Sequence, residues 1–127
     1  MEVVIAVGAM SVLLVALLSL MSLSLRNSRL AKDRARAVAL ASEGVELIRA
    51  YRDYNWNQFL TLADGSNYDL PNNWVVEDGL STACSLERCV RLTLTGGQVE
   101  VDVAVSWQEG SQTFSTNQVT QLSLWER

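Results

Sequence analysis

The sequence contains no histidine, and its 127 residues include only two cysteines and one proline. Histidine is the side chain that most readily exchanges a proton near neutral pH, and it is the commonest metal ligand. A single cysteine pair does not complete a tetrahedral zinc shell. Glycine-rich phosphate loops and nucleophile elbows are also missing. We therefore expect a protein that is not an enzyme and that holds no metal and no cofactor.

Charge is missing from a long N-terminal stretch. No charged residue lies between Glu2 and Arg26, and the run from Val3 to Leu25 has 23 residues. As an α-helix this run would be about 35 Å long, which is enough to cross the hydrocarbon core of a bilayer. A cleavable signal peptide is the alternative, but such peptides carry a basic segment before a shorter apolar run. The sequence therefore predicts a membrane-spanning helix over residues 1–25.

Glu2 lies at the tip of the apolar run. A carboxylate in this position is costly in lipid unless a positive group neutralises it. That group need not belong to the same chain, so Glu2 is a candidate for contact with a partner.

Nothing ends the helix after the apolar run, because residues 26–51 contain no proline and only one glycine. Apolar side chains recur there at spacings of seven, three, four and three, namely Ala31, Val38, Ala41, Val45 and Ile48. Such a stripe is typical of an amphipathic helix, so we expect residues 26–53 to continue the first helix. Serine hydroxyls compete for backbone carbonyls. We therefore expect the helix to bend or unwind at Ser19, Ser22 and Ser24.

The last part of the chain, residues 54–127, has the pattern of a small globular head. Residues 54–73 predict an irregular connection, and the segment Asp64–Asp69 reads as an Asx-rich turn because it lacks the EF-hand order of residues. Alternation and turn residues then predict strands at Asn73–Glu77, Val90–Thr95, Val99–Trp107 and Thr113–Trp125, the last one bent near Asn117. Gly96-Gly97 and Glu109-Gly110-Ser111 are the expected turns.

These elements together predict an α+β fold. Three or four antiparallel strands need a cover for their apolar face, and the amphipathic part of the long helix is the available cover. We therefore expect the first half of the helix to stay free of the head and its second half to pack on the sheet.

Cys84 and Cys89 are separated by four residues. An even number of cysteines in a chain with a membrane segment favours a disulfide in an oxidising compartment. The loop that it would close is short, so it would contribute roughly 2 kcal/mol of stability. Two free thiols in a reducing compartment are the alternative.

Positive charge is scarce in the head. Residues 1–52 carry seven basic and four acidic residues, whereas residues 53–127 carry three basic and ten acidic residues. A basic stem and an acidic head would attract one another between copies, at short range because of salt screening. The basic segment 26–36 favours contacts with lipid headgroups or other subunits, and no specific nucleic-acid site is identified.

The stretch MEVVIAVGAMSVLLVALLSL, the long Ala/Arg-rich helix after it and the small sheet resemble a type IV pilin. The family pattern places a glutamate at the start of the apolar run, where this chain has Glu2 after Met1. The segment LASEGVELIRAYRDYNW is similar to the helix end of pilin-like proteins.

The resemblance implies a structural subunit with the pilin fold. Such subunits wait in the bacterial inner membrane, are processed by a leader peptidase and are then polymerised by a pilus assembly machinery into an extracellular filament. Residues 1–25 would form the filament core, and Met1 and Glu2 would take part in assembly with another copy of the chain. Adhesion, motility and DNA uptake are the roles that the resemblance implies.

Two alternatives stay open on the sequence. A pseudopilin of a type II secretion system shares this kind of N-terminus. A single-pass membrane protein with an acidic, partner-binding head is the other alternative. The rule that basic residues stay in the cytoplasm would put Arg26–Arg36 and the head inside the cell. The pilin resemblance requires the opposite orientation and therefore implies a basic leader upstream.

Overall fold

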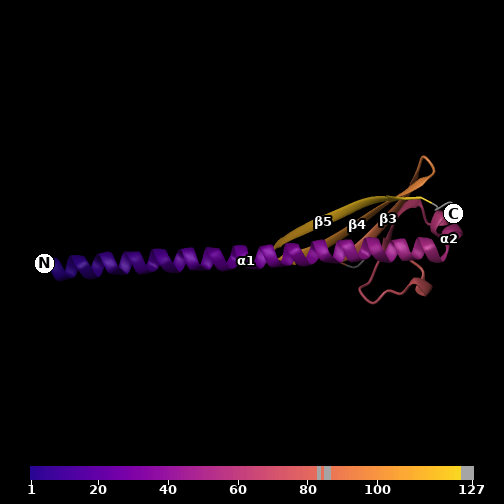
Figure 1. The fold of residues 1–127 in the computed structure, drawn as a ribbon. Helices are drawn as coiled ribbons and strands as arrows, with labels where there is room; N and C mark the ends of the chain where they lie inside the picture. Colours follow the sequence, from indigo (N-terminus) through magenta and orange to yellow (C-terminus); the bar gives the residue numbers. More distant parts are fainter. Residues whose placement is uncertain (83, 85–86, 124–127) are drawn as a thin grey trace. The chain divides into compact units, whose positions relative to one another are not determined.

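The computed structural model describes residues 1–82, 84 and 87–123. The chain divides into two compact units, Met1–Asp33 and Arg34–Arg127, and helix α1 (Glu2–Tyr54) supplies all of the first unit beyond Met1. The remaining elements are α2 (Trp56–Thr61), β1 (Asp64–Asp69), the 3-10 helix η1 (Val76–Asp78), β2 (Ser81–Thr82), β3 (Arg88–Thr95), β4 (Gln98–Glu109) and β5 (Gln112–Leu122) (Figure 1).

The strands form one antiparallel sheet in the order β2-β1-β3-β4-β5. The predicted α+β class is confirmed, with four strands of six or more residues and the two-residue β2 at one edge. Gly96 and Gly97 close the hairpin between β3 and β4 as expected, and both have positive φ angles, of 60° and 84°. Glycine adopts such angles without strain, which suits a two-residue hairpin turn.

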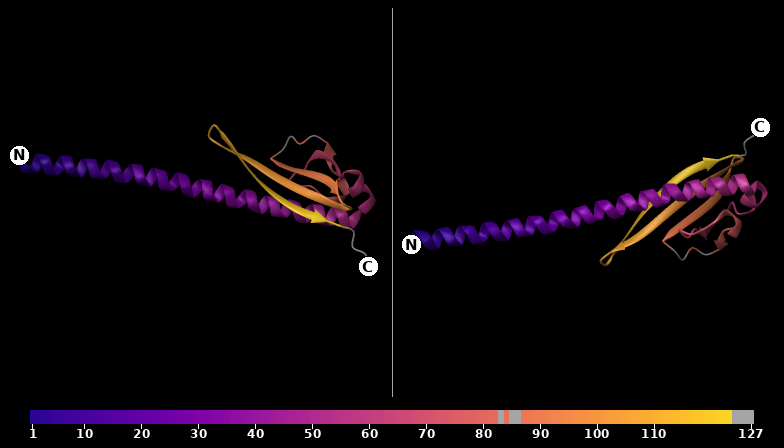
Figure 2. Two further views of the ribbon diagram at one scale, coloured as in Figure 1. Left: turned by 90° about the horizontal axis from the view of Figure 1, so that it is seen from above. Right: turned by 60° about the horizontal axis from the view of Figure 1, so that its bottom comes forward.

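The second half of α1 covers one face of the sheet (Figures 1 and 2). Alternate residues of β4 fill the core beneath it, as the sequence pattern predicted: Val99, Val101, Val103 and Val105. The helix contributes Ala37, Ala41, Gly44, Val45, Ile48 and Tyr51. The core therefore belongs to the unit Arg34–Arg127 and lies between one helix and one sheet face.

The predicted helix stripe is correct at Ala41, Val45 and Ile48 but wrong toward the N-terminus. Ala31 is exposed, and Val38 remains 48% exposed. The buried face instead follows positions 37, 41, 44, 48 and 51, whose spacings of four and three match successive helical turns. The prediction chose the larger Val38, whereas its smaller neighbour Ala37 is the residue that is buried.

The predicted irregular connection at 54–73 is wrong, because it contains α2 and β1. Asn55 starts α2 by accepting a hydrogen bond from the backbone N–H of Gln58 at 3.1 Å, a regular N-cap contact. Strand β1 has a sequence of low strand propensity and is held by its pairing with β3, with an irregularity between Asp64 and Asn67.

The predicted strand Asn73–Glu77 is also wrong. Pro71 begins a turn, in which the Trp74 N–H donates to the Pro71 carbonyl at 3.1 Å. The Trp74 indole N–H donates to the Gly79 carbonyl at 2.6 Å, and η1 lies between these two residues in the sequence. Burial of the Trp74 ring therefore fixes a turn where alternation predicted a strand.

Strand β5 pairs with β4 without interruption from Gln112 to Leu122, so the bend expected near Asn117 is absent from the pairing register. The predicted end of this strand at Trp125 lies outside the described residues. Helix α1 also stays α-helical through residues 19–25, and the unwinding expected there is not observed. The Ser19 hydroxyl donates to the Val15 carbonyl at 2.9 Å, which a regular helix accommodates. The bend at these serines stays a prediction.

Candidate functional site

The N-terminal part of α1 presents apolar side chains on every side. Residues 1–29 are all exposed, and none of the most apolar 18-residue window is buried. Leu13, Leu14, Leu17 and Leu18 are each more than 60% exposed. Burial of one such side chain is worth about 1.5–3 kcal/mol, so a surface of this extent demands an apolar environment. By length and composition the helix is able to cross a membrane.

The polar groups of this segment are compatible with such an environment. The Ser11 hydroxyl donates to the Val7 carbonyl at 2.8 Å, and Ser19 makes the same contact with Val15. A hydroxyl that is bonded within its own helix adds little cost when water is excluded. The structure places Ser22 and Ser24 within the same regular helix.

Met1 and Glu2 lie together at the start of α1. The Met1 carbonyl accepts a hydrogen bond from the Ile5 N–H at 3.3 Å, and Glu2 is the first helical residue. A carboxylate in the first turn is favoured by the helix dipole. Both residues are exposed, so the Glu2 carboxylate is accessible to another molecule.

Arg88 is the buried polar residue that joins the elements of the head, and sequence reasoning missed it. Only 2% of its surface is exposed. Its guanidinium donates to three backbone carbonyls, from Nε to Leu70 at 2.9 Å, from Nη2 to Pro71 at 3.0 Å and from Nη1 to Leu40 at 3.2 Å. Glu43 lies 3.6 Å from Nη1. The arginine thus holds α1, β3 and the segment after β1 together.

A signal for Arg88 does exist in the sequence. Arg88, Val90 and Leu92 alternate along β3 and all three are buried, so the arginine continues the inward-facing register of that strand. The head has few basic residues, and a basic residue in such a register must find acceptors inside the core. Which carbonyls it finds depends on segments far apart in the sequence.

Gly44 allows α1 to approach the sheet beside this arginine. A Cβ atom at Gly44 would lie 2.8 Å from Cγ1 of Val103 and 3.4 Å from Cδ of Arg88. The first distance is shorter than atoms tolerate without moving apart. The glycine therefore sets how closely the helix packs on β4.

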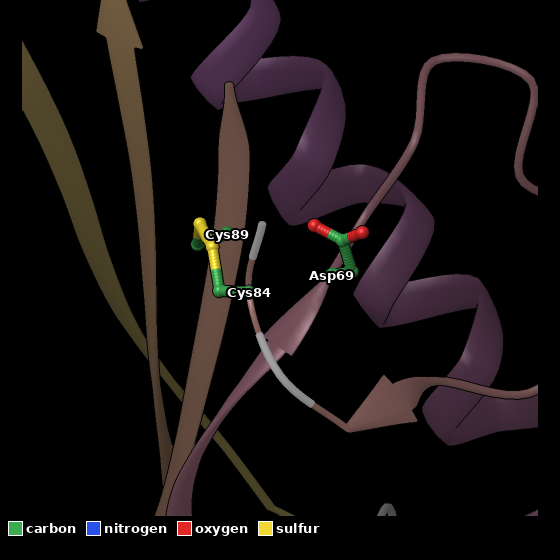
Figure 3. Close-up of side chains that lie close together, drawn as sticks. All are labelled: Asp69, Cys84 and Cys89. Atoms are coloured by element: carbon green, nitrogen blue, oxygen red, sulfur yellow. A yellow bond between two sulfur atoms is a disulfide. The ribbon is translucent and has the colours of Figure 1, made fainter. Parts of the chain in front are cut away.

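The disulfide expected from the two cysteines is present (Figure 3). It joins Cys84 to Cys89 at the start of β3, with Cα atoms 5.7 Å apart. Asp69 lies beside it, and its carboxylate and both sulfur atoms lie within 4.8 Å of one another. The two sulfurs are bonded to each other and so do not act as thiolate ligands. The bridge fastens the segment before β3 next to the end of β1.

An aromatic cluster closes the end of the core beyond Ile48. The ring of Tyr51 meets Trp74 and Phe59 edge to face, with centroids 5.7 and 6.4 Å apart. Burial raises the pKa of the Tyr51 hydroxyl, and this oxygen has no hydrogen-bond partner within the described part of the chain.

The Asx turn expected over Asp64–Asp69 is present only at the start of this segment, from Asp64 to Ser66, and the segment as a whole forms strand β1. The Asp64 carboxylate accepts hydrogen bonds from the Ser66 backbone N–H at 2.8 Å and from the Tyr68 hydroxyl at 3.0 Å. The Ser66 contacts, with help from Tyr68, lower the pKa of the Asp64 carboxyl. These donors occupy the carboxylate and stabilise its charged form within the turn.

No family model, no curated protein sequence and no solved structure matches this chain. The exposed apolar helix needs an apolar environment, whereas the head is closed by its own core.

Proposed function

We propose that the chain is the structural subunit of a type IV pilus filament, a homopolymer built through its N-terminal helix. The proposal joins the pilin-like pattern from Met1 to Leu20 with the long helix and antiparallel sheet of the fold. The filament would serve adhesion, motility or DNA uptake at the bacterial surface. Before assembly the subunit would wait in the inner membrane, where a leader peptidase and an assembly machinery would act on it.

The single observation that carries the proposal is the exposure of the apolar part of α1. This segment is apolar around its whole circumference, while the head already covers its own sheet. A helix without a polar face must be buried in lipid or in other helices. A bundle of such helices provides the same environment as a bilayer, so transfer from membrane to filament has little hydrophobic cost. Head-to-tail contacts that do not close into a ring then give an open polymer.

Glu2 has a specific role under this proposal. Within the filament core its carboxylate meets the positive amino terminus of the mature chain of another copy. A buried ion pair contributes register more dependably than it contributes stability. Glu2 therefore aligns each new subunit with its neighbour.

The test is polymerisation of the purified full chain after removal of detergent, followed by electron microscopy and sedimentation. We expect filaments from the natural sequence. We expect at least a tenfold loss of filament mass from Glu2→Ala. The change leaves the amino terminus of the neighbouring copy as a buried charge without a partner, which costs several kcal/mol, and this cost recurs at every contact between subunits. Glu2→Gln, which keeps the size of the side chain, separates charge from packing. Normal filament yield from Glu2→Ala would contradict the role of this residue.

Two other outcomes point to the alternative functions. Short fibres that form only at high protein concentration would favour a secretion pseudopilin. Insertion into vesicles as single copies, with no fibres at any concentration, would favour a membrane protein with a partner-binding head. The acidic composition of residues 53–127 is the observation that supports this last alternative.

A further inference from the structure

Helix α1 carries a basic and an acidic triplet with identical spacing. The basic triplet is Arg26, Arg29 and Arg36, and the acidic triplet is Glu43, Glu46 and Asp53. In both, the second residue follows the first by three positions and the third follows the second by seven. Each basic residue is therefore seventeen positions before one acidic residue. Both spacings are close to whole helical turns, so the pattern suits contact between helices.

All six side chains are exposed, and α1 is helical at all six positions. The acidic side chains already have contacts within the chain: Glu46 with Arg49 at 2.7 Å, Asp53 with Arg52 at 2.8 Å and Glu43 with Arg88 at 3.6 Å. They nevertheless keep 67%, 62% and 53% of their side-chain surface exposed. A carboxylate accepts several hydrogen bonds, so each one has capacity for a second cation.

We infer that the partner of this face is a second copy of the chain, parallel to the first and displaced by seventeen residues along α1. This displacement is about 25 Å at the rise of an α-helix. It brings Arg26, Arg29 and Arg36 of one copy level with Glu43, Glu46 and Asp53 of the other. The inference rests on the proposed function, because a filament is what places parallel copies beside each other. It adds the register to a second neighbour, which is distinct from the copy whose amino terminus meets Glu2.

Every other displacement of more than one residue matches fewer charges along α1. A shift of fourteen residues pairs Arg29 with Glu43 and Lys32 with Glu46, which gives two pairs. The shift of seventeen gives three pairs and one repulsive neighbour, Lys32 with Arg49. That repulsion is weakened because Arg49 is bonded to Glu46 of its own chain. The shift of seventeen is the one that pairs every member of the basic triplet with a member of the acidic triplet.

The experiment reverses one predicted pair in the full chain and measures the critical concentration for polymerisation after detergent removal. Arg36 and Asp53 are chosen because they form a pair at seventeen residues and none at fourteen. We expect Arg36→Glu and Asp53→Arg each to raise the critical concentration about fivefold, equivalent to about 1 kcal/mol per contact. We expect the combination of both changes to restore it to within about twofold of the natural value.

A matched control separates pairing from net charge. Arg34→Glu makes the same change of charge two residues away, and the position seventeen residues beyond it is the buried Tyr51. We expect Arg34→Glu to have a smaller effect than Arg36→Glu, and Asp53→Arg not to rescue it. Circular dichroism in detergent checks that each variant keeps the fold.

The outcomes are distinct. Absence of filaments from the natural sequence would overturn the proposed function together with the register. Filaments with equal effects of Arg34→Glu and Arg36→Glu, or without rescue by the double change, would overturn the register alone. If Lys32→Glu and Glu46→Lys rescue each other while the changes at Arg36 and Asp53 do not, the register is a shift of fourteen residues and not of seventeen.

Discussion

The two units of this chain share one helix but bury it differently. Residues 1–29 are exposed throughout, whereas the part of α1 after Arg34 has a regular buried face against the sheet. The unit Arg34–Arg127, which includes the head and the part of α1 that covers it, therefore buries its apolar core within one chain, and the N-terminal unit does not. The core that stabilises a single copy therefore lies in the unit Arg34–Arg127, while the apolar surface of the N-terminal unit is left unburied by its own chain.

Removal of the N-terminal unit should break the comparison most strongly. Among the residues that the structure describes, every core residue lies between Ala37 and Leu122, so a chain shortened to residues 34–127 keeps this core. We expect this shortened chain to be folded and monomeric in the absence of detergent, because it leaves out the unburied apolar run. Analytical ultracentrifugation and near-ultraviolet circular dichroism provide the measurement. Aggregation of the shortened chain without detergent would show that the head also depends on the N-terminal unit.

Replacement of Arg88 should have the largest effect of any single substitution in the head. Arg88→Leu removes three hydrogen bonds from the guanidinium, to the carbonyls of Leu40, Leu70 and Pro71. We expect a loss of about 3 kcal/mol, since each hydrogen bond from a buried guanidinium contributes about 1 kcal/mol or more. Urea unfolding of the shortened chain measures this loss. Arg91→Leu, at an exposed position of the same strand, is the control, and a similar loss there would contradict the assigned role of Arg88.

The glycines of α1 allow a finer comparison between the two units. A Cβ atom at Gly44 would meet Val103 at 2.8 Å, whereas one at Gly8 would meet nothing within 4 Å. Gly44→Ala should destabilise the head by about 1–2 kcal/mol, because overpacking outweighs the gain in helix propensity. Gly8→Ala should leave thermal unfolding of the head unchanged and raise helix content slightly. Stabilisation by Gly44→Ala would mean that the helix and β4 separate easily.

Features that depend on local sequence patterns were predicted, whereas features that depend on contacts between distant segments were missed. The alternation of Val99 to Val105 and the Gly96-Gly97 turn are local patterns, and both were predicted correctly. Strand β1 and the buried turn at Trp74 depend on pairing and packing with distant segments, and both were missed. The exposed apolar helix and the disulfide were predicted, but Arg88 was missed because its three acceptors come from residues 40, 70 and 71.

Asp64 offers the smallest test, a pH dependence that belongs to the head and not to the N-terminal unit. Hydrogen bonds from Ser66 and Tyr68 lower the pKa of the Asp64 carboxyl in the folded state. A carboxyl whose pKa is lower in the folded state stabilises that state above its unfolded pKa, about 3.9, and the contribution is lost as the pH falls through the folded pKa. Asp64→Asn should therefore flatten the fall in unfolding temperature of the shortened chain between about pH 4 and pH 2. Tyr68→Phe removes one donor and should flatten it less, since Ser66 is the larger cause; an unchanged profile in Asp64→Asn would show that this turn does not contribute to acid unfolding.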